Sequence, residues 1–160
     1  MDNGQVDLAK WFKVHNRPLG LYARQLLDEE AAADAVQEAF CRLMQQKRRP
    51  DDVGAWLFRT VRNAAVSELR RRRTRVNHAP KLARSRPGWF QSSVVDELDA
   101  GAAQEALGGL AAEDGELIVM RIWGQMTYEQ MASVTGAAVS TVRARYLAAL
   151  EELRKKMVTS

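Results

Sequence analysis

The sequence of 160 residues has room for one ordinary domain or two small ones, and its formal net charge of +4 alone says little about its partners. The single cysteine, Cys41, excludes a disulfide framework, and no apolar run approaches the roughly 18 residues of a membrane-spanning helix. Because the N-terminus also lacks a signal-peptide pattern, we expect a cytoplasmic protein without membrane insertion.

The charges are segregated along the chain. Residues 42–86 hold 14 basic and 3 acidic side chains, whereas residues 87–130 hold 1 basic and 8 acidic ones. The basic block favours a polyanion as its partner, and the acidic block indicates a partner of another kind.

The first predicted elements are helices. Apolar residues recur at helical spacing from Val6 to Leu27, and the interruption at Asn16-Arg17-Pro18 predicts two short helices, because proline breaks a helix interior. Asp28 then precedes another helical stripe from Glu29 to Gln46, as an N-cap or linker. The polar face of that helix carries Asp34, Gln37, Glu38, Arg42 and Gln45. Taken alone, such a face is most simply a solvated surface.

After a turn-rich loop from Lys47 to Gly54, a basic helix is predicted from Ala55 to Arg75. One arc of it is apolar and expected in the core: Leu57, Phe58, Val61, Ala64, Ala65 and Leu69. The other arc holds Trp56, Arg59, Asn63, Val66, Ser67 and Arg70. Cations, an amide and a large aromatic are the groups that contact phosphates, base edges and unstacked bases. The dense run Arg70, Arg71, Arg72, Arg73 and Arg75 suits counterion release from nucleic acid.

The second half of the chain carries the sharpest local signal. Helices are predicted over 96–110 and 113–123, and Thr127 with Gln130 then form a capping box for a short helix that stops at Gly136. Ser140 is predicted to cap a longer helix, from Thr141 to about Met157.

A short helix, a glycine turn and a longer helix predict a helix-turn-helix, whose second helix enters the major groove of DNA. The positions expected in the core are Val142, Tyr146, Ala149, Leu150, Leu153 and Met157. The positions left for DNA are Ser140, Thr141, Arg143, Ala144, Leu147 and Ala148. The alternative is a helical hairpin that does not bind DNA.

No strand pattern occurs, so the predicted fold is all-α, with two small helical lobes over 5–75 and 96–158. Residues 76–95 lack any sustained period and are predicted to be a flexible linker. Its cations Lys81, Arg84 and Arg86 and the pair Trp89-Phe90 suggest a tether that docks along its path rather than a passive spacer.

Three stretches resemble the extracytoplasmic-function (ECF) class of bacterial sigma factors: DAVQEAF at 34–40, AWLFRTVRNAAVSELRRRR from Ala55, and TYEQMASVTG followed by VSTVRARYLAALEELRK. The resemblance implies a first lobe like region 2, which binds the clamp helices of the polymerase β′ subunit and melts the minus-ten element. It implies a second lobe like region 4, which binds the β flap and reads the minus-thirty-five element. Core RNA polymerase, promoter DNA and an anti-sigma factor are therefore the expected partners, with no cofactor.

The resemblance also assigns residues. Polymerase binding falls to Asp34, Gln37, Glu38 and Arg42. Minus-ten contacts fall to Trp56, Arg59, Asn63, Arg70, Arg71, Arg72 and Arg73, with Asn63 and the loop 47–54 near a flipped base. Minus-thirty-five contacts fall to Arg143, Ala144, Leu147 and Ala148, which match the recognition-helix positions, with Ser140 and Thr141 beside them. Because most of these are small or aliphatic, direct base readout would depend mainly on Arg143.

Other classes of protein explain the sequence less well. His15 and His78 lie in unrelated segments, and no metal-ligand spacing or phosphate-binding glycine loop is present, so we expect neither catalysis nor a metal. A helix-turn-helix regulator that does not replace a polymerase subunit explains only the second lobe. An adaptor that binds only protein leaves the arginines without a role.

Overall fold

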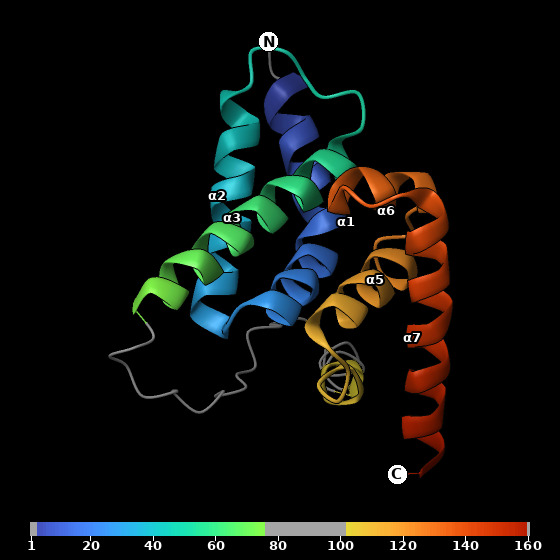
Figure 1. The fold of residues 1–160 in the computed structure, drawn as a ribbon. Helices are drawn as coiled ribbons and strands as arrows, with labels where there is room; N and C mark the ends of the chain where they lie inside the picture. Colours follow the sequence, from blue (N-terminus) through green and yellow to red (C-terminus); the bar gives the residue numbers. More distant parts are fainter. Residues whose placement is uncertain (1–2, 76–101, 160) are drawn as a thin grey trace.

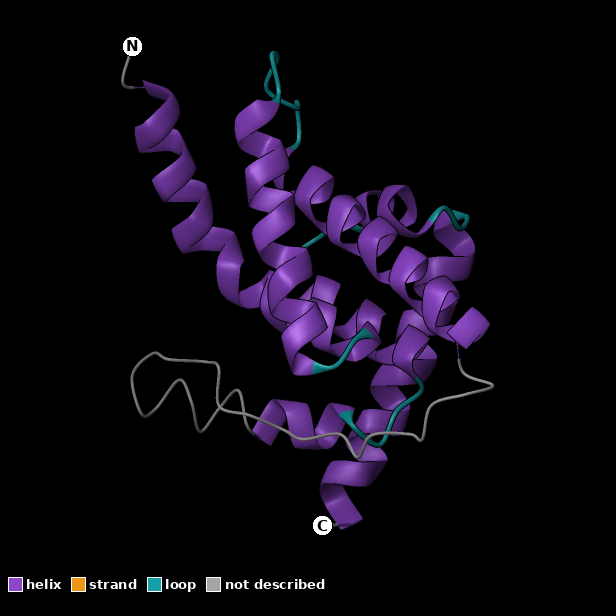
Figure 2. Ribbon diagram, turned by 90° about the vertical axis from the view of Figure 1, so that its left-hand side faces the viewer, coloured by secondary structure: helices purple, strands orange, loops and turns teal. Residues whose placement is uncertain are grey.

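The computed structural model describes residues 3–75 and 102–159, and every regular element in these two ranges is a helix (Figures 1 and 2). The first lobe contains α1 (Asn3–Leu26), α2 (Glu29–Gln45) and α3 (Val53–Arg75). The second lobe contains a short helical segment at 102–107, α5 (Ala112–Ile122), α6 (Tyr128–Thr135) and α7 (Val139–Thr159). The predicted linker, with Lys81, Arg84, Arg86, Trp89 and Phe90, lies outside the described residues.

Helix α1 is continuous, so the prediction of two short helices was wrong. Pro18 lies inside it, although a proline in a helix interior costs about 3 kcal/mol. The next turn compensates, because Leu19, Tyr22 and Ala23 are completely buried. Full burial of one leucine side chain contributes about 1.5–3 kcal/mol, so the packing of this turn can offset the lost backbone bond.

Helix α2 begins as the sequence predicted. The Asp28 side chain is the N-cap and accepts a hydrogen bond from the backbone N–H of Ala31 at 3.0 Å. Its apolar stripe, including Ala32, Val36 and Phe40, is buried against the rest of the first lobe.

Helix α3 begins two residues before the predicted position, and Asp52 caps it by accepting from the backbone N–H of Ala55 at 3.0 Å. The expected core arc is largely confirmed, with Leu57, Phe58, Val61 and Ala65 buried and Ala64 half-buried. Leu69 is 40% exposed, against the prediction.

The helix-turn-helix of the second lobe is confirmed. Thr127 and Gln130 form both bonds of the capping box of α6, and Gly136 ends that helix in the left-handed region at φ 78°. Helix α7 begins at Val139, so Ser140 lies in its first turn and is not its cap. On the predicted core face of α7, Val142, Tyr146, Ala149 and Leu153 are buried and Leu150 is half-buried, whereas Met157 is 63% exposed.

The two lobes are packed together. Helix α5 lies between α1 and α7, and α6 lies against α3 (Figure 1). Four consecutive residues of α5, Leu117 to Met120, are buried, which requires cover on every side of the helix. The buried apolar residues of both lobes form one cluster. None of the described helices is both long and apolar enough to cross a membrane.

Candidate nucleic-acid interface

The polar face of α2 is fully available. Asp34, Gln37, Glu38 and Arg42 are all exposed, as their predicted role in binding a protein partner requires. Glu38 and Arg42 form an ion pair at 2.9 Å along the helix, and both side chains are more than half exposed. Such a surface pair adds little to stability, so these charges are free to meet a partner.

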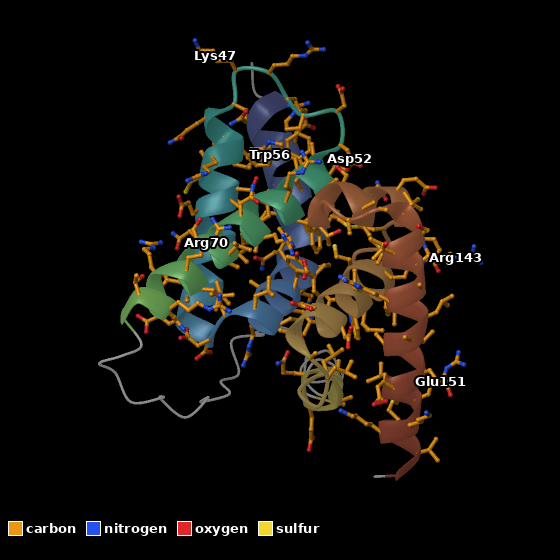
Figure 3. The ribbon with its side chains drawn as sticks, viewed as in Figure 1. Lys47, Asp52, Trp56, Arg70, Arg143 and Glu151 are labelled. Carbon is orange, nitrogen blue, oxygen red and sulfur yellow. The ribbon has the colours of Figure 1, made fainter. Side chains whose placement is uncertain are left out.

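The loop after α2 is fixed to the N-terminal part of α1. Arg49 forms an ion pair with Asp7 at 2.8 Å, and its guanidinium lies over the Trp11 ring, 4.5 Å from the centroid. Lys47, at the far end of the loop, is exposed and points away from the protein (Figure 3). The loop that the sequence predicted near the minus-ten element is therefore held against α1 by Arg49, whereas Lys47 is exposed to solvent.

A hollow of about 340 Å³ lies where this loop and the start of α3 meet α6. Its lining residues come from both lobes: Pro50, Asp51, Asp52, Ala55, Trp56 and Arg59 from the first, and Glu129, Gln130 and Ser133 from the second. The structure thus brings Trp56 and Arg59 together with the loop. It also places the second lobe directly against them.

The predicted minus-ten residues divide into covered and open ones. Trp56 is half-buried beside α6, whereas Arg59 is exposed although it donates a hydrogen bond to the Ser133 hydroxyl. Asn63 is exposed one turn further along α3 and does not line the hollow. The predicted contact of Asn63 with a flipped base stays a prediction.

The arginines at the end of α3 differ in their surroundings. Arg70, Arg71 and Arg73 are exposed, although Arg71 pairs with Glu68 at 3.0 Å. Arg72 is instead held within the lobe, by Asp28 at 2.8 Å and Glu68 at 3.2 Å. Partial burial works against its charge, but Asp28 and then Glu68 raise the pKa of Arg72 above its ordinary value. The sequence prediction, which treated the four arginines alike, missed this tie between α3 and the cap of α2.

The face of α7 that the sequence predicts to contact DNA is open to solvent. Ser140, Arg143, Ala144, Leu147 and Ala148 are exposed, and Thr141 is half-buried. Leu147 is 48% exposed, so an apolar side chain lies on this face beside Arg143. Arg143 points away from the first lobe (Figure 3). This face could enter a DNA groove without any rearrangement of its neighbours.

Sequence reasoning missed a group of residues at the contact between the lobes. Glu116 of α5 is 2% exposed and accepts hydrogen bonds from the Tyr22 hydroxyl and from Arg62 Nε, the latter at 2.6 Å. These donors lie 94 and 54 residues away along the chain, so no local pattern could reveal the contact. Within the described ranges, no group of acidic, histidine or cysteine side chains could hold a metal ion.

Two family models match the chain. The model described as Sigma-70 region 2 matches residues 12–75, and the one described as Sigma-70, region 4 matches residues 100–153. These ranges agree with the two lobes of the structure.

Curated relatives and a solved structure agree with this assignment. The ECF RNA polymerase sigma factor SigL of Mycobacterium tuberculosis is 32% identical over 152 residues, which cover 89% of this chain and 84% of SigL. EcfG of Rhodopseudomonas palustris, another ECF RNA polymerase sigma factor, is 29% identical over 123 residues, 72% of this chain and 65% of EcfG. Bartonella quintana RpoE, solved with the anti-sigma factor NepR, has a similar fold, with a TM-score of 0.72 at 23% identity over 94% of this chain and 96% of RpoE.

Proposed function

The chain belongs to the ECF class of RNA polymerase sigma factors, and we propose that three of its faces perform the steps of promoter-specific initiation. The polar face of α2 binds core polymerase through Asp34, Gln37, Glu38 and Arg42. The face of α3 and the loop before it recognise and melt the minus-ten element. The N-terminal half of α7 reads the minus-thirty-five element.

The observation that carries this proposal is the division of α7 into two sides. Val142, Tyr146 and Ala149 are buried in the lobe, whereas Arg143 and Leu147 are exposed on the opposite side. A helix that is fixed by one side and presents a cation and an apolar side chain on the other has the layout of a major-groove reader. Arg143 supplies the directional hydrogen bonds, and Leu147 supplies apolar contact.

The charges of the first lobe support a separate contribution to DNA binding. Arg70, Arg71 and Arg73 are exposed at one end of α3, and Arg70 points away from the protein at that end (Figure 3). Exposed arginines supply phosphate contacts that position DNA without reading its sequence. Asn63, exposed on the same helix, then remains the proposed reader of a flipped minus-ten base.

The activity we propose involves no chemical step by this chain, which would act in the cytoplasm by directing the polymerase. An anti-sigma factor is a further proposed partner, because the solved relative RpoE is found with NepR. The alternative of a DNA-binding regulator is not favoured, because matches to both sigma regions cover the two lobes.

The proposal is tested by reconstitution. The purified chain, mixed with core RNA polymerase and a library of genomic fragments, should co-elute with the core enzyme and produce transcripts from a restricted set of promoters. Core enzyme alone should produce none of these transcripts. Tight promoter binding by the isolated chain, with no association with core enzyme, would overturn the proposal in favour of a regulator.

A further inference from the structure

The contact between the lobes is built around a buried carboxylate. The Glu116 side chain is 3% exposed and pairs with Arg62 Nε at 2.6 Å, while Tyr22 donates its hydroxyl to the same oxygen, Oε1. A buried carboxylate is strongly unfavourable unless it is paired and hydrogen-bonded. Both donors belong to the first lobe and Glu116 belongs to the second, so this pairing exists only while the lobes are in contact.

The Tyr22 hydroxyl and the Arg62 guanidinium both keep their protons, as donation to Glu116 requires. Burial, and then the charge of Glu116, raise the pKa of Tyr22 well above its ordinary value, so its hydroxyl keeps its proton. Burial acts against the charge of Arg62, but Glu116 raises the pKa of this guanidinium overall. Tyr22 also packs edge-on against Phe58 with ring centroids 5.0 Å apart, which fixes the direction of its hydroxyl.

Further polar contacts align the lobes on either side of Glu116. Gln130 Nε2 donates to Asp52 Oδ2 at 2.7 Å. Asp52 also caps the start of α3, and Gln130 belongs to the capping box at the start of α6. On the other side, Gln25 Nε2 donates to Gln104 Oε1 at 3.1 Å. The lobes therefore meet in one defined register, since each of these bonds depends on the same relative position.

This register covers part of the proposed minus-ten surface. Helix α6, the first helix of the helix-turn-helix, lies against the start of α3, where Trp56 is half-buried and Arg59 bonds to Ser133. An unstacked base cannot reach the Trp56 ring from the side that α6 occupies. A chain in this arrangement also cannot spread its two lobes over two separate promoter elements.

We infer that Glu116, Tyr22 and Arg62 form a latch that holds the free chain in a closed, inactive arrangement, which core polymerase must open before α3 can receive promoter DNA. This inference rests on the proposed function for its inhibitory part, and on the contacts alone for the latch. Loss of any one latch residue shifts the population toward the open arrangement, and the apparent affinity for core enzyme rises with the open fraction.

The latch is tested with Glu116→Gln and Tyr22→Phe, which act on it from opposite lobes. Tyr22→Phe removes one oxygen and leaves the buried ring in place, so it tests the latch if Glu116→Gln should fold poorly. Glu151→Gln is the matched control, because it removes one negative charge from the exposed side of α7, which faces away from the first lobe (Figure 3). Fluorescence energy transfer is measured in a Cys41→Ser background between dyes on Lys13→Cys and Arg154→Cys, both exposed positions.

Both latch variants should lower the energy transfer in the free chain and increase its apparent affinity for core enzyme by roughly tenfold, whereas the control should change neither. Unchanged energy transfer in both variants would overturn the latch, whether or not the chain binds polymerase. Lower transfer with unchanged affinity would overturn the inhibitory role. A chain that opens as expected and never binds core enzyme would instead refute the proposed function and leave the latch standing.

Discussion

The helices proposed to read the promoter, α3 and α7, differ in how much of their reading face is free. On α7 the face around Arg143 is open, whereas on α3 the start of the face, at Trp56 and Arg59, lies against α6. Both faces have a similar mixture of cations and apolar side chains in the sequence. The comparison teaches that such a composition identifies a binding surface but does not indicate whether the free protein exposes it.

The largest effect is expected on the face of α2, which neither lobe covers. Asp34→Lys combined with Glu38→Lys should weaken association with core polymerase by on the order of 100-fold, because reversal of charges that become buried at an interface costs several kcal/mol. Glu151→Lys with Glu152→Lys makes the same change in net charge on α7 and should leave association within about twofold, as equilibrium binding to core enzyme would show. A similar loss of affinity for core polymerase in both double variants would mean that net charge, and not the α2 face, controls binding.

The open face of α7 should respond next. Arg143→Ala should reduce holoenzyme binding to promoters by about 1–3 kcal/mol, the range for a bidentate contact to a base, and relax preference within the minus-thirty-five element. The energy transfer between the lobes should stay unchanged, because Arg143 faces away from the contact. Binding assays with single-base variants measure the effect. An equal loss for every base at every position would indicate a phosphate contact instead.

A smaller effect distinguishes the arginines at the end of α3. Arg70→Gln with Arg73→Gln should weaken binding to all promoters by about tenfold and flatten its salt dependence by about two units of slope. Arg72→Gln should leave most of that slope and lower the free energy of unfolding by up to about 1 kcal/mol, because Arg72 pairs with Asp28 and Glu68. Salt titrations and denaturant unfolding measure these effects. If Arg72→Gln flattened the salt dependence of DNA binding as much as the double variant does, Arg72 could not be separated from Arg70 and Arg73.

The smallest effect concerns Asp28, whose pKa is lowered by the backbone N–H of Ala31 and by Arg72, against partial burial. Its contribution to stability is therefore full above its ordinary pKa of 3.8 and is lost as the pH falls through the lowered value. Asp28→Asn keeps a good N-cap and removes the ion pair, so it should cost about 0.5 kcal/mol at neutral pH. In denaturant unfolding, the difference from the native chain should vanish in acid. A difference that persists there would mean that the cap itself was damaged.

Local interactions explain why most of the fold could be predicted. The capping box of Thr127 and Gln130 spans three residues and needs no tertiary contact, so its sequence pattern suffices. Pro18 is the opposite case, because burial of the following turn against other helices overrides a local preference. At Ser140 the cap prediction was wrong, because α7 begins at Val139, two residues before the predicted start.

For the candidate site, the sequence predicts which helix faces are exposed but not how the lobes cover them. The exposed faces of α2 and α7 follow from helical periodicity, which places polar residues away from the core. The covered part of α3 does not, because it depends on how the lobes meet. Glu116 lies among acidic residues at the start of α5 and resembles its exposed neighbour Glu113 in the sequence. Glu116 differs from Glu113 only in the folded protein, where α1 and α3 bring Tyr22 and Arg62 to its side chain.

The central claim is that the covered face of α3 must be freed before initiation, and a reversible cross-link tests it most directly. Gln25 and Gln104 touch across the contact at 3.1 Å and belong to none of the proposed binding faces. Gln25→Cys and Gln104→Cys in a Cys41→Ser chain, joined by a reducible reagent, should give a protein that produces no promoter-specific transcripts with core enzyme. Reduction should restore the transcripts to the level of the untreated variant. Full transcription by the cross-linked chain would contradict the claim.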